Sequence, residues 1–114
     1  FLARLYMVVE ERRFLDGARG YFAVNRACGE RALRGTGCCK TGWAAAALFR
    51  ITGEREYLGV ARQAAEEIVA AQRPEGDWAE VGRSDILECD AAGELCYHLC
   101  QYCLELASYR ADRN

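Results

Sequence analysis

Residues 41–78 read TGWAAAALFRITGEREYLGVARQAAEEIVAAQRPEGDW, and this stretch decides the fold of the chain. The segment that begins at Trp43, WAAAALFRI, is apolar almost all round, which predicts a helix buried on more than one side. Thr41 is suited to be the N-cap of this helix. Gly53 lies just past its end, where a left-handed backbone favours glycine. The segment is therefore predicted to be the inner member of a helical pair.

The second part of the stretch, residues 54–73, is predicted to be a longer helix with one apolar face. That face comprises Tyr57, Ala61, Ala64, Ala65, Ile68 and Val69. Charged side chains occupy the other side, as on the exposed surface of an amphipathic helix. Pro74 ends the helix, and Gly76 makes a turn that leads into Trp78. A buried helix joined through a short turn to a one-sided helix is an αα-hairpin.

The residues before this hairpin are predicted to form a partial copy of the same unit. Apolar spacing predicts a helix over residues 1–15 that stops near the turn signal Asp16-Gly17. A second helix is predicted over residues 18–34, and residues 35–39 follow as a loop. The N-terminal part of the chain is thus expected to be helical as well.

The residues after the hairpin are predicted to start a further unit. Asp85 and Glu88 have the spacing of a capping box, and a last helix is predicted from there to about residue 109. One stripe of this helix is apolar and rich in cysteine: Cys89, Cys96, Leu99, Cys100, Cys103 and Leu106. Buried free cysteine behaves as a small hydrophobe, so this stripe is predicted to be the core face.

Composition places the chain among all-α globular domains. Its 114 residues are 52% hydrophobic and 28% charged, with one proline, and they are predicted to form a single domain spanning residues 1–114. A net charge of −2 with interspersed signs argues against nucleic-acid binding. No apolar run is long enough for a membrane span. Seven cysteines, an odd number, do not suit a small disulfide scaffold, which favours a reducing, cytoplasmic setting.

The hairpin resembles those of the (α/α) toroid superfamily, which includes terpenoid cyclases, protein prenyltransferase β-subunits and six-hairpin carbohydrate enzymes. Ile68-x3-Gln72-x3-Gly76-x-Trp78 is similar to the second half of the QW motif of squalene–hopene-type cyclases, with Glu67 in place of the expected aromatic residue. A glutamine near a helix end caps backbone groups, and a tryptophan stacks over the turn. Further similar segments are Thr52-Gly53-Glu54-Arg55-Glu56-Tyr57-Leu58 and, at the entry to an inner helix, Gly35-Thr36 and Thr41-Gly42-Trp43-Ala44.

The resemblance implies an incomplete ring. The chain holds about two hairpins plus the start of a third, and open ends of a helical stack expose apolar faces. We therefore expect a fragment of a larger toroid, or a homo-oligomer, with the remaining hairpins or a second copy covering those faces. The chain begins at Phe1 rather than at a methionine, which agrees with that expectation.

Two acidic residues are the candidate catalytic groups. The resemblance implies an active site at the ends of the inner helices, where acids serve as general acids or bases. Asp90 and Glu94 lie one turn apart near the start of the last predicted helix, close to the Cys38-Cys39 loop. The Asp-x-Asp-Asp motif of class II terpenoid cyclases does not occur in the sequence. For Asp85 and Glu88 the capping role is favoured.

Zinc is a minority possibility, and no cofactor is predicted. In protein prenyltransferases an Asp, a Cys and a His hold zinc, and Cys89, Cys96 and His98 are the corresponding weak candidates here. The cysteine spacing is also that of a core face, which we favour. His98, the only histidine, is more typical of a helix side than of a catalytic base.

The sequence thus predicts antiparallel helical hairpins of the α/α-toroid type. The functional hypothesis is part of an enzyme resembling terpenoid cyclase/prenyltransferase-like or six-hairpin carbohydrate-active proteins, with the reaction unassigned. The alternative is a non-catalytic helical-repeat module that binds a protein partner through its exposed apolar faces.

Overall fold

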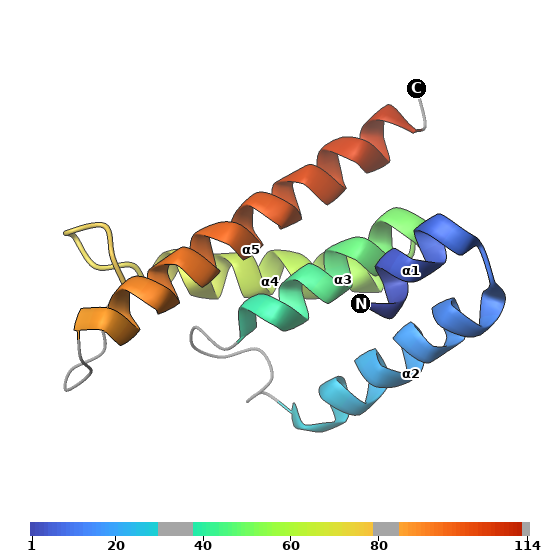
Figure 1. The fold of residues 1–114 in the computed structure, drawn as a ribbon, viewed down its shortest axis with the longest axis horizontal. Helices are drawn as coiled ribbons and strands as arrows, with labels where there is room; N and C mark the ends of the chain where they lie inside the picture. The colour runs from blue at the N-terminus through green and yellow to red at the C-terminus, as the bar shows by residue number, and fades with distance from the viewer. Residues whose placement is uncertain (30–37, 79–84, 113–114) are drawn as a thin grey trace.

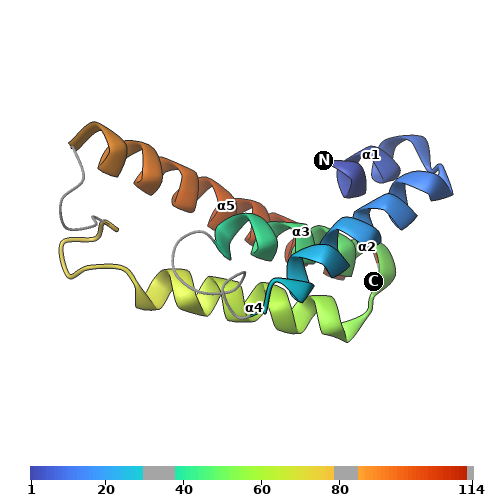
Figure 2. The same cartoon turned by 90° about the horizontal axis from the view of Figure 1, so that it is seen from below.

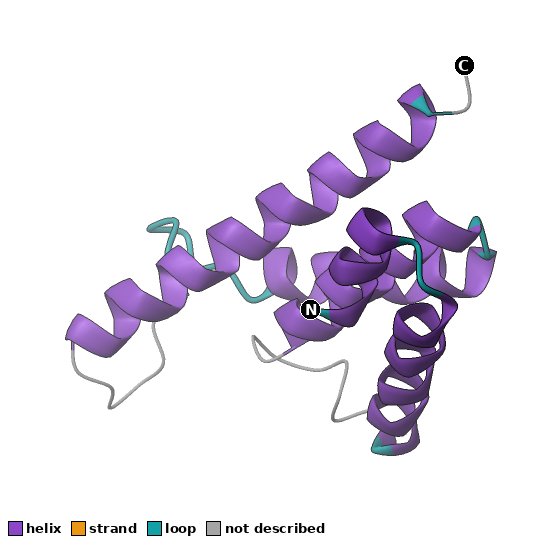
Figure 3. Cartoon of the chain, turned by 45° about the vertical axis from the view of Figure 1, so that its right-hand side comes forward, coloured by secondary structure: helices purple, strands orange, loops and turns teal. Residues whose placement is uncertain are grey.

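The computed structural model describes residues 1–29, 38–78 and 85–112, and in residues 85–91 it describes the backbone helix only. The described residues contain helices and no strand, so the predicted all-α class is confirmed (Figure 3). The helices are α1 (Leu2–Val9), α2 (Arg12–Ala27), α3 (Cys39–Thr52), α4 (Arg55–Ala70) and α5 (Asp85–Ala111). None of the helices in these ranges is long and apolar enough to cross a lipid bilayer.

Helix α3 is the centre of the fold. It contacts each of the other four described helices, and Figure 2 shows it between α4 and α5. In Figure 1 helix α5 runs diagonally beside α3 and crosses the C-terminal part of α4. Ala45, Ala46 and Leu48 of α3 are almost completely inaccessible to solvent. The prediction of an inner helix buried on more than one side is therefore confirmed.

The α3–α4 hairpin forms as predicted. Gly53 ends α3 in the left-handed conformation, at φ 72°, and its N–H donates a hydrogen bond of 2.7 Å to the carbonyl oxygen of Phe49. Gly42 allows the two helices to approach closely, because a Cβ atom at this position would lie 2.6 Å from the Cβ of Ala64. Small residues thus set the distance between the inner and outer helices.

The buried face of α4 differs from the prediction at Val60, which is buried, at Ala65, which is half-buried, and at Val69. Its buried residues are Tyr57, Val60, Ala61, Ala64 and Ile68. Val69, predicted to belong to this face, is 58% exposed. The buried stripe is centred on Tyr57, Ala64 and Ile68. Adjacent helical residues lie about 100° apart around the axis, so Val69 falls well to one side of this centre.

The turn after α4 is closed by the two residues of the half motif. The Gln72 side chain donates a hydrogen bond of 2.7 Å to the carbonyl oxygen of Gly76, which has φ 92°. The indole N–H of Trp78 donates to the carbonyl oxygen of Ile68 at 2.7 Å and so caps the last turn of α4. Both residues thus have a structural role, as predicted, but the tryptophan rather than the glutamine caps the helix, and the glutamine bonds a carbonyl group of the turn.

The N-terminal helices divide at a different place from the one predicted. Helix α1 ends before Glu10, which has the left-handed conformation at φ 57°, and Asp16-Gly17 lies inside α2. Gly17 serves packing rather than a turn, because a Cβ there would lie 3.0 Å from Cδ1 of Leu2. The ion pair between Arg12 and Asp16, one helical turn apart, also suits a continuous α2. Residues 30–34 of the predicted second helix lie outside the described residues.

Thr41 is not the N-cap of α3, which corrects the prediction. The helix already begins at Cys39, and Thr41 is buried within its first turn. Its hydroxyl oxygen accepts a hydrogen bond of 3.3 Å from the side-chain amide of Asn25 on α2. The Thr41 side chain therefore makes a contact between α2 and α3 and does not cap its own helix.

The cysteine-rich stripe of α5 is not the core face. Cys96, Cys100 and Cys103 are exposed, and the side chain of Cys89 lies outside the described residues. The buried positions of α5 are instead Leu95, His98 and Glu105, at a heptad-like spacing. Leu99 and Leu106 pack against the core as predicted, and the helix begins at Asp85 and ends two residues after the predicted end.

Glu105 occupies a core position although its side chain is charged, because two arginines pair with its carboxylate. Its carboxylate is 1% exposed and lies 2.9 Å from the Arg4 guanidinium and 3.3 Å from that of Arg50. A buried charge is tolerated where it is paired. This ion-pair cluster joins α1, α3 and α5.

Candidate functional site

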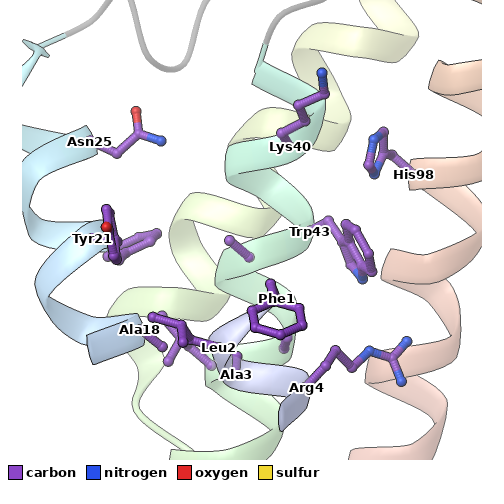
Figure 4. Close-up of a pocket in the computed structure, with 14 residues that line it drawn as sticks. Phe1, Leu2, Ala3, Arg4, Ala18, Tyr21, Asn25, Lys40, Trp43 and His98 are labelled. Atoms are coloured by element: carbon purple, nitrogen blue, oxygen red, sulfur yellow. The ribbon is translucent and has the colours of Figure 1, made fainter. Parts of the chain in front are cut away.

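A pocket of about 610 Å³ lies among α1, α2, α3 and α5. Most of its wall is apolar, with Leu2, Phe22 and Leu48 among the residues that form it. The polar lining side chains are Arg4, Asn25, Lys40 and His98, which Figure 4 shows arranged around the opening between the helices. Small-molecule sites in proteins typically have about 300–1,000 Å³ and a mostly apolar wall with a few polar groups. The pocket meets that description.

Trp43 and His98 form one side of the pocket. Their ring centroids are 5.2 Å apart and the ring planes are inclined at 49°. Trp43 comes from α3, one turn after Lys40, and His98 comes from α5. The packing of α3 on α5 therefore places an indole, an ammonium group and an imidazole at the same part of the pocket (Figure 4).

His98 is buried, at 7% exposure, yet one of its nitrogens is unsatisfied. Its Nε2 lies 3.6 Å from Oε1 of Glu94, whereas no described residue forms a hydrogen bond with its Nδ1. The buried indole nitrogen of Trp43 likewise has no hydrogen-bond partner among the described residues. Nearly all buried polar atoms in proteins are hydrogen-bonded, so such exceptions point to a missing ion, water or ligand.

Glu94 lies between two basic side chains. Its Oε1 is 2.9 Å from the Lys40 ammonium group, in addition to its contact with His98. The hydrogen bond from Lys40 is the main cause that lowers the pKa of Glu94, and the same hydrogen bond raises the pKa of Lys40. Glu94 is therefore a carboxylate at neutral pH.

Cys39 faces the same place from the start of α3. Burial is the main cause that raises the pKa of its thiol, and the negative charge of Glu94 adds to it. The neighbouring Cys38 has a different role, since its thiol donates a hydrogen bond of 3.4 Å to the carbonyl oxygen of Ala64. Burial raises the pKa of Cys38 to about 11, so this thiol is a packing group.

Cys39, Glu94 and His98 form a cluster of potential ligands. One ligand atom of each residue, a sulfur, a carboxylate oxygen and a ring nitrogen, lies within 4.8 Å of the other two. Such a set supports metal binding, and it also supports proton transfer between the imidazole and a bound molecule.

The structure brings together some of the residues singled out in the sequence. Glu94 and His98 lie in the cluster, one turn apart on α5. Cys96 is exposed and lies outside it. The side chains of Asp90 and Cys89 fall outside the described residues, so their part in the site stays a prediction.

Sequence reasoning missed Lys40 and Trp43. The sequence offers one signal for Lys40, since it is the only lysine of the chain. In the structure it lines the same pocket as His98, the only histidine. Trp43 was assigned to the buried inner helix, and its nearness to His98 depends on how α3 packs on α5. Comparison with protein-family models, with curated proteins and with solved structures finds no match to the chain.

Proposed function

We propose that the chain is part of an enzyme of the α/α-toroid type, with its substrate in the pocket between α1, α2, α3 and α5. The observation that carries the proposal is the pocket itself, about 610 Å³ with a mostly apolar wall. Its size suits a small molecule, and Lys40, Trp43 and His98 supply polar groups on one side of it.

The chemistry of the wall favours one class of substrate. Because the wall is largely apolar, it suits the hydrocarbon body of a substrate such as those of the terpenoid-cyclase/prenyltransferase-like enzymes better than a carbohydrate. The Trp43 indole is a donor only, so its unsatisfied nitrogen suits an oxygen acceptor on the ligand. The proposed substrate is an amphipathic molecule with an apolar body and one hydroxyl, carbonyl or carboxylate group.

The proposed catalytic groups lie at the start of α5. Glu94, kept ionised by Lys40, is suited to accept a proton or to stabilise positive charge that develops in a substrate. Asp90, one turn earlier in the sequence, is the second proposed group. His98 would transfer protons between Glu94 and a bound molecule.

Ligand binding is the first test. Long-chain fatty alcohols and carboxylates, isoprenoid alcohols and oligosaccharides would be titrated by calorimetry, with intrinsic tryptophan fluorescence as a second readout. We expect the amphipathic compounds to bind and to alter the fluorescence, and the Trp43→Phe variant to lose that response. Binding of oligosaccharides alone would contradict the proposed substrate class.

A variant that fills the pocket makes the test specific. Ala44 lines the pocket and is exposed, so Ala44→Phe would occupy the space without opening the core. We expect it to weaken binding about tenfold or more, which equals ~1.4 kcal/mol. Ala70→Phe, on the exposed side of α4, is the matched control. Equal affinities of the two variants would place the ligand elsewhere.

The exposed side of α5 supports the second hypothesis, a surface that a protein partner covers. Leu104 is 56% exposed, and Tyr97 and the three described cysteines of this helix are exposed as well. We propose that further hairpins or a second copy of the chain cover this side. Sedimentation velocity over a range of concentrations would show self-association that Leu104→Glu abolishes. A monomer at every concentration would contradict the second-copy form.

A further inference from the structure

We propose that Cys39, Glu94 and His98 bind one divalent transition-metal ion, with zinc the best-suited metal. The site lies where the first turn of α3 meets α5. The ion displaces the proton of the Cys39 thiol, which is released to solvent, so that the three side chains bind it as a thiolate, a carboxylate and an imidazole. These are ligands that zinc commonly has in proteins. The proposal concerns these three residues and holds whether or not the pocket binds an organic ligand. In the metal-bound protein Glu94 and His98 are ligands rather than the proton-transfer groups proposed above.

The distances are compatible with coordination of one ion by all three residues after a small adjustment. The three ligand atoms lie within 4.8 Å of one another. In tetrahedral zinc sites with bond lengths of about 2.0–2.3 Å, ligand atoms are roughly 3.5 Å apart. The side chain of Glu94 is at the surface, so a change of its rotamer brings its carboxylate closer without disturbing the core.

The helices fix the other two ligands. Glu94 and His98 are four residues apart on α5, and side chains at that spacing lie one above the other on one face of a helix. Cys39 is buried at the start of α3, the helix that packs most extensively against α4 and α5. Two of the three ligands are thus held in place by packing before any ion binds, which favours binding.

His98 gives an independent reason to expect a ligand here. Its imidazole is more than nine-tenths buried, no described residue satisfies its Nδ1, and its Nε2 lies 3.6 Å from Oε1 of Glu94, which is longer than a hydrogen bond. Leaving such a nitrogen without a partner is unfavourable, and a bound ion is one of the few ways to compensate a buried histidine. The cluster therefore contains a buried imidazole that the described residues leave without all of its hydrogen-bond partners.

Lys40 is the competitor of the metal ion. Its ammonium group now pairs with the carboxylate of Glu94, at 2.9 Å, from a side chain that is 71% exposed. An exposed ion pair of this kind contributes little to stability. A divalent ion that binds Glu94 therefore displaces an ammonium group that returns to water at small cost.

Three protein ligands leave a fourth position open. Zinc sites with three protein ligands and an exchangeable water are the catalytic type, whereas structural sites use four protein ligands. His98 also lines the large pocket. The fourth position would then be reachable from the place where we propose that the substrate binds, and this last point rests on the proposed function.

Cobalt titration of the 114-residue chain is the test. After treatment with a chelator, the protein would be titrated with Co²⁺ alone and then with Zn²⁺. We expect one Co²⁺ per chain, a thiolate-to-cobalt charge-transfer band, the visible bands of tetrahedral cobalt, and loss of both on addition of one equivalent of Zn²⁺. Absence of saturable binding overturns the proposal.

Variants assign the ligands. Cys39→Ser should abolish the charge-transfer band, and Cys96→Ser, which changes an exposed cysteine of α5 outside the cluster, should leave it unchanged. A band that survives Cys39→Ser, or that disappears in Cys96→Ser, overturns the site.

Surface variants keep the test valid if a change at a buried ligand impairs folding. Glu94→Gln should weaken Co²⁺ binding about tenfold or more, as loss of one ligand does. Lys40→Met should strengthen binding several-fold, because it removes the competing cation. If neither change alters the affinity, Glu94 and Lys40 form only a surface ion pair and the proposal fails.

Discussion

The indole N–H of Trp78 donates a hydrogen bond to the carbonyl oxygen of Ile68, 2.7 Å away and ten residues earlier in the chain. Ile68 belongs to the last turn of α4, where carbonyl groups have no partner within the helix. Trp78 itself is buried against Ile68 and Leu95. One side chain therefore caps α4 and also packs in the same apolar cluster as Leu95 of α5.

Replacement of Trp78 by phenylalanine should lower the free energy of unfolding. The change leaves the Ile68 carbonyl buried without a donor, which costs about 1–3 kcal/mol. Urea denaturation followed by circular dichroism measures it. Gln72→Ala, which removes an exposed hydrogen bond of the same turn, should cost less. A smaller effect of Trp78→Phe than of Gln72→Ala would contradict the capping role.

Two glycine-to-alanine changes should have opposite effects. At Gly42 the new Cβ meets the Cβ of Ala64 at 2.6 Å, so the variant should lose about 1–3 kcal/mol of stability through overpacking. At Gly59, on α4, no described atom outside the neighbouring backbone lies within 4 Å of a new Cβ. Gly59→Ala should therefore gain about 0.5–1 kcal/mol from helix propensity.

Chemical denaturation of both variants provides the comparison. Adding Ala64→Gly to Gly42→Ala should recover part of the lost stability, because the second change removes the atom that the new Cβ meets. Absence of any recovery would mean that the helices α3 and α4 are not in contact at this point.

The stability of the fold should depend on Arg4 and Arg50, which pair with the buried carboxylate of Glu105. Replacing Arg4 and Arg50 together by methionine leaves an uncompensated buried charge, which should cost about 3–5 kcal/mol. Adding Glu105→Met should restore most of that stability, since an apolar group of similar volume needs no counter-ion.

The control for this experiment is Asp112→Ala. Asp112 also pairs with Arg50, at 3.4 Å, but it is exposed and should matter little. Thermal unfolding of the four proteins gives the order. A triple variant that is less stable than the double variant would show that the cost lies in the arginine side chains rather than in the buried carboxylate.

Alkaline pH should destabilise the fold through Tyr57. Burial is the main cause that raises the pKa of its hydroxyl above the ordinary value of about 10. The folded state then holds this proton at a pH where the unfolded chain has lost it, so stability falls as pH rises above about 10. In denaturation experiments between pH 9 and 11, the free energy of unfolding of Tyr57→Phe should fall less than that of the unchanged protein. An identical pH profile would contradict this role.

Local signals made the α3–α4 hairpin predictable. Gly53, Pro74 and Gly76 mark its turns, and the alanine-rich segment of α3 is apolar on all sides. The break at Glu10 was not predictable in the same way, because it depends on α1 folding back on α2 with Gly17 against Leu2. A sequence pattern identifies a glycine but not whether it serves a turn or a close contact.

The same distinction between local signals and tertiary packing applies to the candidate site. Glu94 and His98 share a face of one helix, so their spacing alone places them together. Cys39, Lys40 and Trp43 join them only through the register of α3 on α5, which is a non-local property. The cysteines of α5 misled the prediction, since a thiol is as compatible with an exposed helix face as with a core.

The position of α3, in contact with all four other helices, also has a consequence for how the molecule opens. Removing any neighbour exposes the small apolar residues of α3, among them Ala45 and Ala46. The amide hydrogens of α3 should therefore exchange with solvent only when the whole domain unfolds, whereas those near the ends of α2 exchange through local fraying. Folding would then be a single cooperative event that depends on the helix at the centre of the described fold.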